Sequence, residues 1–538
     1  MDKTFRKLYC SVLMLLVTMM IPIVVLAAGQ DIIILHTNDT HCGVSDNLGF
    51  SRISQYKKDL KKQGYPVLLV SAGDDIQGAP IGKLSKGEAI VKIMNAVGYD
   101  FVIPGNHEFD YGVPRFLELA KKMKCGYYSS NFTNIKTHKL VLKPYKIVNA
   151  GGKKIGFVGA TTPETLVTST PKFFQDADGK FIYGFSEDET GEKLYKAIQE
   201  AVDNARKDGA DYVFLVGHLG TDGSIPRWSS GAVAANTYNV DAIIDGHSHE
   251  QYIHKIVNKV GKVVQVAQTG TKLQTVGKMV IHEDGSIEAS LVRELKDSDK
   301  KIEKIIAREN KRFEAILNQP VGEALVDLTG NDPKTGERRV RNGETNLGDF
   351  VADAYRTVLD TDIAIVNGGS IRNTIKKGVF TYNDLLEAFP FGNMCTVIEA
   401  TGQQIVDALE VGVSNYPDEH GAFMQVSGMT YTIDPSVPSG LVLDAKGNFV
   451  EVKGERRVKD VMVNGKPIDL NAKYTVGGTT YILKDGGNGL TMFKNCNLLK
   501  DGVMTDVDAI MEYVQNYLNA KVGDGYENPY GAGRITVK

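Results

Sequence analysis

The sequence predicts an α/β protein in which two α/β regions are joined by a helix. Short apolar runs alternate with polar helical stretches from residue 31 to about 295, as in βαβ-like units. Residues 296–318 carry apolar side chains at helical spacing among many charged ones, which is typical of an amphipathic connecting helix, and Pro320 helps to end it. Apolar runs at 363–366 and 397–398 then mark a second α/β region. The length of 538 residues allows roughly two to four domains, and no internal repeat relates the two regions.

The N-terminus predicts export. Basic residues at Lys3, Arg6 and Lys7 precede an apolar stretch over 8–26 and the small residues Ala27-Ala28-Gly29, as in a signal peptide. The alternative is an uncleaved anchor, because about 18 apolar residues can span a bilayer. No other segment is apolar enough for a span, so we expect a secreted, periplasmic or cell-surface protein. The predicted division is a leader over 1–28, a domain over 29–295, a connecting helix segment over 296–320 and a domain over 321–538.

Composition excludes several partners and scaffolds. The chain holds 62 Lys and Arg against 65 Asp and Glu, a net charge of −3, so there is no basic surplus for a nucleic-acid polymer. Apolar residues make up 42% of the chain and charged residues 24%, which is ordinary for a globular protein. Five cysteines are too few for a disulfide scaffold, and we expect the four after the leader to be free or weakly used thiols.

Polar clusters follow five strands predicted in the first region. Six strands are expected, at 32–35, 67–70, 101–103, 155–158, 212–216 and 242–244, and a cluster follows each of them except the one at 155–158. The clusters are His36-Thr37-Asn38-Asp39-Thr40-His41, Gly73-Asp74-Asp75, Gly105-Asn106-His107-Glu108-Phe109-Asp110, Gly217-His218 and Asp245-Gly246-His247-Ser248-His249. In open α/β sheets the carboxyl ends of strands are where sites are built. We therefore expect these clusters to form one site.

The clusters predict a two-metal centre. Seven side chains are candidate ligands: Asp39, His41, Asp74, Asn106, His218, His247 and His249. These ligand types suit divalent ions such as zinc or manganese, and seven exceed the need of one ion. Asp74 could bridge two ions, with a hydroxide between them as the nucleophile. Each cluster alone has a plainer interpretation, such as a capped turn with a surface histidine or a structural His218. We assign no role to the remaining histidines after the leader: His36, His138, His254, His282 and His420.

With these motifs the sequence resembles the calcineurin-like metallophosphoesterases, and within them the 5'-nucleotidase family, over nearly all of the mature chain. The resemblance implies a four-layer sandwich for the first domain. It also implies that Asp39, His41 and His249 bind one ion, that Asn106, His218 and His247 bind the other, and that Asp74 bridges them. His107 and Asp110 match the catalytic dyad of the family, in which the aspartate orients the histidine towards the transferring phosphate or its leaving oxygen.

The second region has residue types that nucleotide binding needs. Cations, flat rings and amides occur around Asn367-Gly368-Gly369-Ser370-Ile371-Arg372, Arg341, Phe389-Pro390-Phe391-Gly392-Asn393, and Tyr481 before Asp485-Gly486-Gly487-Asn488. Alone, each also fits a turn or a core aromatic. The resemblance implies that Arg341 and Arg372 hold the nucleotide, that Phe391 and Asn393 form one wall of a base clamp, and that Asn367 contacts substrate. It also makes Tyr481 and Asn488 candidate substrate contacts.

Three positions depart from the family pattern. Ile482 stands at the usual place of the second clamp ring, and Tyr481 lies one residue earlier. Asn488 replaces an aspartate that contacts the nucleoside, and keeps hydrogen bonding while losing charge. Glu337 stands where some members have a third arginine. These changes leave the preferred base open but do not touch the predicted metal ligands.

The sequence thus predicts an exported two-metal phosphohydrolase that removes phosphate from nucleoside 5'-monophosphates or cleaves related bonds in longer nucleotides or nucleotide sugars. Its partner would be a small nucleotide bridging both domains, with domain closure about the connecting helix. One alternative is a 2',3'-cyclic phosphodiesterase with 3'-nucleotidase activity, which shares the metal motifs. Another is a non-catalytic surface binding protein that keeps the fold.

Overall fold

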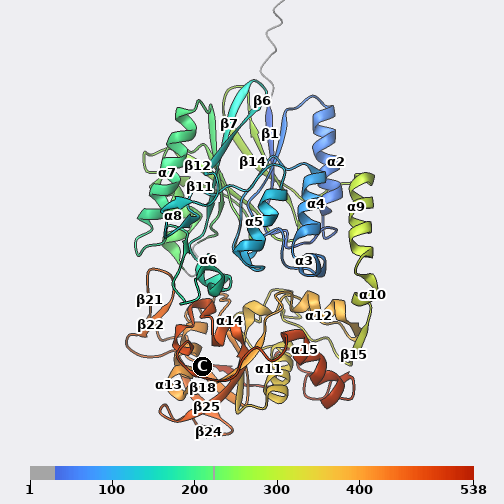
Figure 1. Ribbon diagram of the computed structural model, residues 1–538, viewed down its shortest axis with the longest axis vertical. Helices are drawn as coiled ribbons and strands as arrows, with labels where there is room; N and C mark the ends of the chain where they lie inside the picture. The colour runs from blue at the N-terminus through green and yellow to red at the C-terminus, as the bar shows by residue number, and fades with distance from the viewer. Residues whose placement is uncertain (1–30, 222–224) are drawn as a thin grey trace, which may run out of the picture.

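The computed structural model describes residues 31–221 and 225–538, so the predicted leader lies outside the described residues. Elements up to β14 (Ile287–Val292) form the upper part of the molecule in Figure 1, and elements from β15 (Pro320–Ala324) onwards form the lower part. Helices α9 and α10 run down one side between the two parts. None of the helices in the described ranges is long and apolar enough to cross a bilayer.

Two sheets face each other in the upper part. The first has the order β14 (Ile287–Val292), β13 (Val276–Ile281), β1 (Ile32–Thr37), β2 (Val67–Ser71) and β3 (Phe101–Val102). The second has the order β11 (Gln251–Val257), β12 (Val263–Thr269), β10 (Ala242–Ile244), β9 (Tyr212–His218), β7 (Lys153–Thr161) and β6 (Tyr145–Ala150). Ile34, Phe101 and Phe214 belong to one buried apolar cluster between them. The six predicted strands are all present, but they divide three and three between these sheets.

Helices cover the outer face of each sheet. Those beside the first sheet are α2 (Gly49–Lys62), α3 (Pro80–Ser85), α4 (Glu88–Val97) and α5 (Val113–Lys122). Those beside the second are α7 (Glu192–Lys207) and α8 (Ser230–Asn236). Leu35 of β1 shares a buried cluster with Phe50 of α2, and Leu215 of β9 shares another with Ile198 of α7. The layer order is helix, sheet, sheet, helix, which confirms the four-layer sandwich.

Shorter elements connect these layers. They are η1 (His107–Phe109), β4 (Thr133–Asn134), β5 (Lys139–Leu140), α6 (Thr165–Thr168), η2 (Pro171–Phe174), β8 (Tyr183–Gly184) and η3 (Pro226–Trp228). Among the described residues, α6 is the part of the upper region that reaches towards the lower one at the left of Figure 1. Glu164, the residue just before α6, lines the cavity of the candidate site.

The expected connecting helix is two helices. α9 spans Lys300–Lys311 and α10 spans Glu314–Leu317, with a break at Arg312 and Phe313. Asp299 caps α9 by accepting a hydrogen bond from the Lys301 N–H at 3.0 Å. Ile302 is buried where α9 packs on α2 and α4, whereas on α10 Ile316 is 47% exposed and Leu317 is partly buried against the core of the lower part. The domain boundaries stay a prediction.

The lower part is built around a five-stranded sheet. Its order is β19 (Met424–Ser427), β16 (Ile363–Asn367), β25 (Lys473–Thr479), β18 (Cys395–Thr401) and β26 (Asn497–Lys500). Smaller sheets contain β17 (Gly378–Thr381), β15 (Pro320–Ala324) and β27 (Lys521–Val522); β24 (Lys466–Pro467), β23 (Val458–Val463), β20 (Met429–Ile433) and β28 (Ile535–Val537); and β21 (Leu441–Leu443) with β22 (Phe449–Val452). The helices are α11 (Asn346–Leu359), α12 (Tyr382–Ala388), α13 (Gly402–Gly412), α14 (Thr480–Leu483) and α15 (Asp506–Glu512), with the short turns η4 (Gly368–Ser370), η5 (Gly487–Gly489), η6 (Thr491–Phe493) and η7 (Tyr513–Tyr517). The α/β class predicted for both regions is confirmed.

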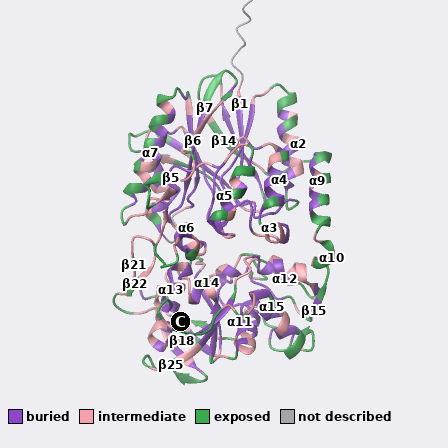
Figure 2. Cartoon of the chain, viewed as in Figure 1, coloured by how far each residue is buried: buried purple, intermediate pink, exposed green. Residues whose placement is uncertain are grey.

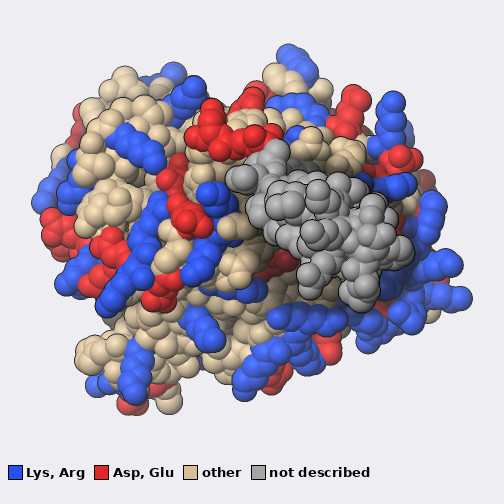
Figure 3. All heavy atoms as spheres, turned by 90° about the horizontal axis from the view of Figure 1, so that it is seen from above, with Lys and Arg blue, Asp and Glu red and all other residues tan. Residues whose placement is uncertain are grey.

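Burial follows this layering. Figure 2 shows buried residues along the sheets and the inward faces of the helices, with exposed residues on the outward faces. Seen from above, Lys and Arg are spread among Asp and Glu over the visible surface (Figure 3). Cys42, Cys125, Cys395 and Cys496 are free, as expected.

Candidate functional site

The loops after several strands converge on one place. β1 pairs in parallel with β2, and β2 with β3, while β9 pairs in parallel with β10. The carboxyl ends of these strands therefore meet at the same edge of each sheet. All seven predicted ligands lie on these strand ends or on the loops that follow, so two separate sheets contribute to one site.

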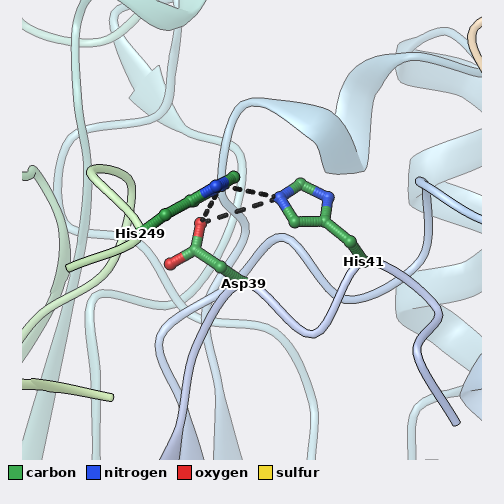
Figure 4. Close-up of side chains that lie close together, drawn as sticks. All are labelled: Asp39, His41 and His249. Carbon is green, nitrogen blue, oxygen red and sulfur yellow. Dashed lines mark hydrogen bonds and ion pairs between the residues drawn. The ribbon is translucent and has the colours of Figure 1, made fainter. Parts of the chain in front are cut away.

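Asp39, His41 and His249 form the first group of ligand atoms (Figure 4). The Nε2 atoms of His41 and His249 lie 2.9 Å apart, and Asp39 Oδ1 lies 3.3 Å from His249 Nε2 and 3.9 Å from His41 Nε2. Asp39 is fully buried, and within the described ranges its Oδ1 accepts no hydrogen bond. An orphaned carboxylate oxygen facing two imidazole nitrogens is a donor set that fits a divalent ion.

The remaining predicted ligands form a second group beside the first. His218 Nε2 lies 3.1 Å from Asp74 Oδ2 and 3.2 Å from Asn106 Oδ1, and His247 Nδ1 lies 3.0 Å from the same amide oxygen. Asp74 Oδ2 is also 3.9 Å from His41 Nε2, so this oxygen faces both groups. Asp74 Oδ2 thus lies between the two groups, and its role as a bridge between two ions stays a prediction.

The backbone is held in an unusual conformation at most of these positions. Positive φ angles occur at five of the seven predicted ligands: Asp39 (48°), His41 (43°), Asp74 (58°), His247 (85°) and His249 (63°). Such angles are uncommon for residues other than glycine, and each costs of order 1–3 kcal/mol unless the surroundings enforce it. The fold therefore stores strain where it directs these side chains inward.

The electrostatics of the site favour positive charge. Burial alone would raise the pKa of Asp39, but the neighbouring His249 and His218 outweigh it and lower this pKa to about 2. Burial alone would lower the pKa of His218, but the carboxylates of Asp74 and Asp39 raise it to about 10. Two buried carboxylates thus stabilise a cation between them, and divalent ions are cations that such a pocket can bind.

Glycines permit the close approach of the ligands. A Cβ atom on Gly105 would lie 2.2 Å from Asp74 Oδ1 and 2.7 Å from His218 Cε1. A Cβ atom on Gly246 would lie 2.9 Å from His218 Nδ1. Gly105 and Gly246 are therefore required by packing against the ligand side chains.

The sequence reasoning missed two buried carboxylates behind the ligands. Glu108 accepts the backbone N–H groups of Asp74 (2.8 Å), Asp75 (2.7 Å) and Gly105 (2.6 Å), and so ties two ligand loops together. Asp75 accepts the hydroxyls of Thr40 and Ser71 at 2.8 and 2.6 Å. Burial raises the pKa of Glu108 to about 8 and that of Asp75 to about 7. Their positions inside the ligand motifs were the available signal.

The predicted dyad lies beside the ligand groups. His107 Nδ1 is 2.6 Å from Asp110 Oδ2, and Ser169 Oγ donates to the other oxygen of Asp110 at 2.9 Å. On the opposite edge of the ring, His107 Nε2 is 3.3 Å from Nη2 of Arg372, which comes from the lower part of the molecule. The Arg372 guanidinium also lies 5.0 Å from the ring centroid of Phe391. The dyad therefore meets the second region directly.

A cavity of about 1150 Å³ opens between the two parts of the molecule. All seven predicted substrate contacts line it: Arg341, Asn367, Arg372, Phe391, Asn393, Tyr481 and Asn488. From the first region it is lined by Asp74, Asn106, His107, Asp110, His247 and His249 among others, whereas Asp39, His41 and His218 lie deeper. The structure thus brings the two predicted sets together around one space.

Tyr481, and not Ile482, faces this cavity. Ile482 is fully buried in the apolar core of the lower part. Tyr481 Oη donates a hydrogen bond to the carbonyl oxygen of Val167 at 2.8 Å, a contact that crosses between the two parts. Its ring lies close to Gly487, where a Cβ atom would come within 2.3 Å of it. The second aromatic ring of the expected clamp is therefore shifted by one residue, from position 482 to Tyr481, and an aromatic side chain still lines the cavity.

Several further side chains line the cavity that the sequence did not single out. Arg338 forms an ion pair with Glu419 there, and Glu164 lies 3.3 Å from Nε2 of His247. His254 and His420, to which we assigned no role, also line it. No local motif surrounds these residues, so only the packing of distant segments places them here.

Comparisons with known proteins match both regions. A family model described as calcineurin-like phosphoesterase matches residues 32–251, and a model of the 5'-nucleotidase C-terminal domain matches residues 320–495. A 5'-nucleotidase of Vibrio cholerae is 28% identical, with 87% of this chain and 89% of the relative covered. The crystal structure of a 5'-nucleotidase precursor from Thermus thermophilus superposes with a TM-score of 0.78 at 26% identity, covering 94% of this chain and 99% of that one.

Some relatives are much longer than this chain. The trifunctional nucleotide phosphoesterase YfkN of Bacillus subtilis is 28% identical over 91% of this chain, which spans only 34% of that relative. The endonuclease YhcR of the same organism is 27% identical, and this chain spans 36% of it. The matches confirm the family resemblance drawn from the sequence.

Proposed function

The chain belongs to the 5'-nucleotidase family of calcineurin-like metallophosphoesterases, and from that premise we propose that it is a two-metal phosphohydrolase acting on nucleoside 5'-monophosphates. One observation carries this proposal. The two groups of candidate ligand atoms and the cations and rings of the second region line the same cavity, and Arg372 reaches His107 across it at 3.3 Å. A nucleotide bound there would have its phosphate beside the ligand groups and its base beside the aromatic rings.

Seven residues would hold the ions. Asp39, His41 and His249 would bind one, Asn106, His218 and His247 the other, and Asp74 would contact both. Two bound divalent ions, of which zinc and manganese suit these ligands best, supply positive charge for the phosphate oxygens and lower the pKa of water.

The protein's own side chains would position the phosphate and handle the proton. Asp110 accepts the Nδ1–H of His107 and so orients the ring with Nε2 towards Arg372 and the cavity. That nitrogen is placed to interact with the phosphate or its leaving oxygen. Arg372 brings a fixed cation to the same point, and its planar guanidinium suits phosphate oxygens. Phe391 and Tyr481 offer flat faces for a base.

Phosphate release from AMP by the purified protein, with manganese or zinc present, tests the proposal. We expect His218→Ala to lower the rate by at least about 100-fold, because it removes an imidazole from the ligand set. An unchanged rate in this variant would overturn the two-metal role. The same preparation should contain close to two ions per chain, whereas a non-catalytic binding protein with this fold would contain none and release no phosphate.

A panel of substrates separates the related activities. The panel includes cyclic nucleotides beside 5'-monophosphates, because the sequence leaves the 2',3'-cyclic phosphodiesterase alternative open. The panel should contain 2',3'-cyclic AMP, 3'-AMP, 5'-AMP, ADP and a nucleotide sugar. We expect the highest kcat/KM with a 5'-monophosphate. A higher value with the cyclic nucleotide would replace the proposal by the phosphodiesterase alternative.

Export and domain division belong to the same proposal. The leader over 1–28 would direct the protein out of the cytoplasm, which cell fractionation with and without these residues tests. The division into a phosphoesterase domain over 29–295 and a substrate domain over 321–538 would place the ions on one and the base on the other. A nucleotide bridging both would favour a closed arrangement about the 296–320 segment.

A further inference from the structure

Two of the candidate ligand imidazoles are oriented by backbone carbonyls. His41 Nδ1 lies 3.1 Å from the carbonyl oxygen of Gln77, and His218 Nδ1 lies 2.7 Å from that of Ala72. In a neutral imidazole one nitrogen donates and the other accepts. A carbonyl oxygen can only accept, so in the neutral ring that metal binding requires, each Nδ1 keeps the proton and each Nε2 directs its lone pair towards the candidate ion site.

His247 is arranged the other way round. Its Nδ1 faces Asn106 Oδ1 at 3.0 Å, in the second ligand group, and its Nε2 is 3.3 Å from Oε2 of Glu164. Glu164 comes from the segment after β7 that enters α6, 83 residues away in the sequence. The side chains of His247 and Glu164 are 20% and 16% exposed, so this contact is partly buried in the wall of the cavity. In the described ranges, the nitrogen that faces away from the candidate ion site therefore meets a backbone carbonyl in His41 and His218 but a carboxylate in His247.

We propose that Glu164 is a positioning residue for the second metal site, which accepts the Nε2–H of His247 and leaves its Nδ1 free to bind the ion. This inference rests on the proposed function, because it takes His247 to be a ligand. A carboxylate behind a ligand imidazole sets its tautomer and ring orientation and raises its basicity, and loss of such partners typically weakens metal binding by about 10–100-fold. No family motif that we identified includes Glu164.

Zinc binding to the metal-free protein tests this role without using activity. Competition against a chromogenic chelator gives the affinity of each of the two binding steps. His247→Ala identifies which step depends on His247. We expect Glu164→Ala to weaken that same step by about 10–100-fold and to leave the other unchanged. Glu164→Gln should fall between Glu164→Ala and the unchanged protein, because the amide oxygen still accepts the Nε2–H but carries no charge.

Glu250→Ala is the matched control. Glu250 also lines the cavity and follows His249 in the chain, but its carboxylate accepts a hydrogen bond from Thr221 Oγ1 at 2.8 Å and forms no hydrogen bond or ion pair with a candidate ligand among the described residues. Its loss removes the same charge and should leave both steps unchanged. Melting of the metal-free variants confirms that each is folded.

The outcomes separate the inference from the function on which it rests. Glu164→Ala with unchanged affinity in both steps, an equal loss in both, or a loss confined to the other step would overturn the role of Glu164. If Glu164→Gln bound zinc as weakly as Glu164→Ala in this step, the loss of affinity would come from the charge of Glu164 alone. That result would also overturn the positioning role. If the unchanged protein bound no zinc, the proposed function itself would fail.

Discussion

Substitution of Gly105 by alanine tests how closely the site is packed. The added Cβ atom would lie 2.2 Å from Asp74 Oδ1 and 2.7 Å from His218 Cε1, both far inside normal contact distance. The φ angle of Gly105 is not in the left-handed region, so alanine brings no backbone strain. Its N–H would still donate to Glu108. Any effect therefore comes from the displaced ligands.

The geometry gives the size of the effect. A carbon and an oxygen need roughly 3.2 Å and two carbons roughly 3.5 Å, so the Asp74 carboxylate would have to move by about 1 Å and the His218 ring by about 0.8 Å. A shift of about 1 Å in a catalytic group can lower a rate by about 100-fold. Overpacking of this kind also costs about 1–3 kcal/mol of stability. We expect Gly105→Ala to lower kcat/KM for AMP by about 100-fold and to weaken zinc binding.

Phosphate release and zinc competition measure this effect, and urea unfolding measures the loss of stability. Gly330→Ala is the control, since a Cβ atom there would meet its nearest neighbour, Val340 Cγ1, at an ordinary 3.4 Å and its φ is not left-handed either. This variant should keep both the rate and the zinc affinity. A Gly105→Ala protein that bound zinc and released phosphate like the unchanged protein would refute the reasoning from close approach.

Three further outcomes follow from side chains described above. Burial lowers the pKa of His36 from 6.5 to about 3, so the unfolded chain takes up its proton first and stability is lost as the pH falls from 6.5 towards 3. At pH 5 this group lowers the free energy of unfolding by about 2 kcal/mol. Urea unfolding at pH 8 and at pH 5 should therefore show a fall in stability that is about 2 kcal/mol smaller for His36→Gln than for the unchanged protein. An equal fall in both proteins would contradict this reasoning. Tyr481→Phe keeps the ring but loses the hydrogen bond to the Val167 carbonyl oxygen, which joins the two regions. Such a bond is worth about 1 kcal/mol, so KM for AMP should rise by up to about fivefold. An unchanged KM would count against a role for this hydrogen bond. Arg372→Ala removes the cation beside His107 and should lower kcat/KM by about 100-fold. Arg372→Lys should restore only part of kcat/KM, because a lysine lacks the planar guanidinium with its two parallel donors. Full activity of Arg372→Lys would argue against a bidentate contact with the phosphate.

Much of the site could be predicted because its chemistry is local. Asp74 and His218 each follow an apolar strand within a few residues, and the carboxyl ends of parallel strands meet at one edge. The types of the seven candidate ligands and their order were therefore visible without coordinates. The substrate contacts of the second region needed the family resemblance, because a Gly-Gly turn or a phenylalanine has many plain uses.

Other features of the fold had no local signal. β1 and β9 both appear in the sequence as short apolar runs, because each strand is buried on both faces. Neither has an alternation of apolar and polar residues that would assign it to one sheet or the other. The division of six strands into two facing sheets is therefore absent from the periodicity. The break between α9 and α10 was likewise missed, because the apolar spacing continues to Leu317, although α9 packs on the core of the upper part and Leu317 packs on that of the lower part.

The sequence by itself determined the class of the fold, the chemical types of the ligands and the family. The tertiary structure decided which side chains face one another. His107 meets Arg372 from 265 residues away, and His247 meets Glu164 from 83 residues away. Contacts of this kind depend on how sheets and regions pack, and packing is set by the whole buried surface rather than by any short segment. The sequence therefore names the groups that can do the chemistry, and the packed fold decides their partners.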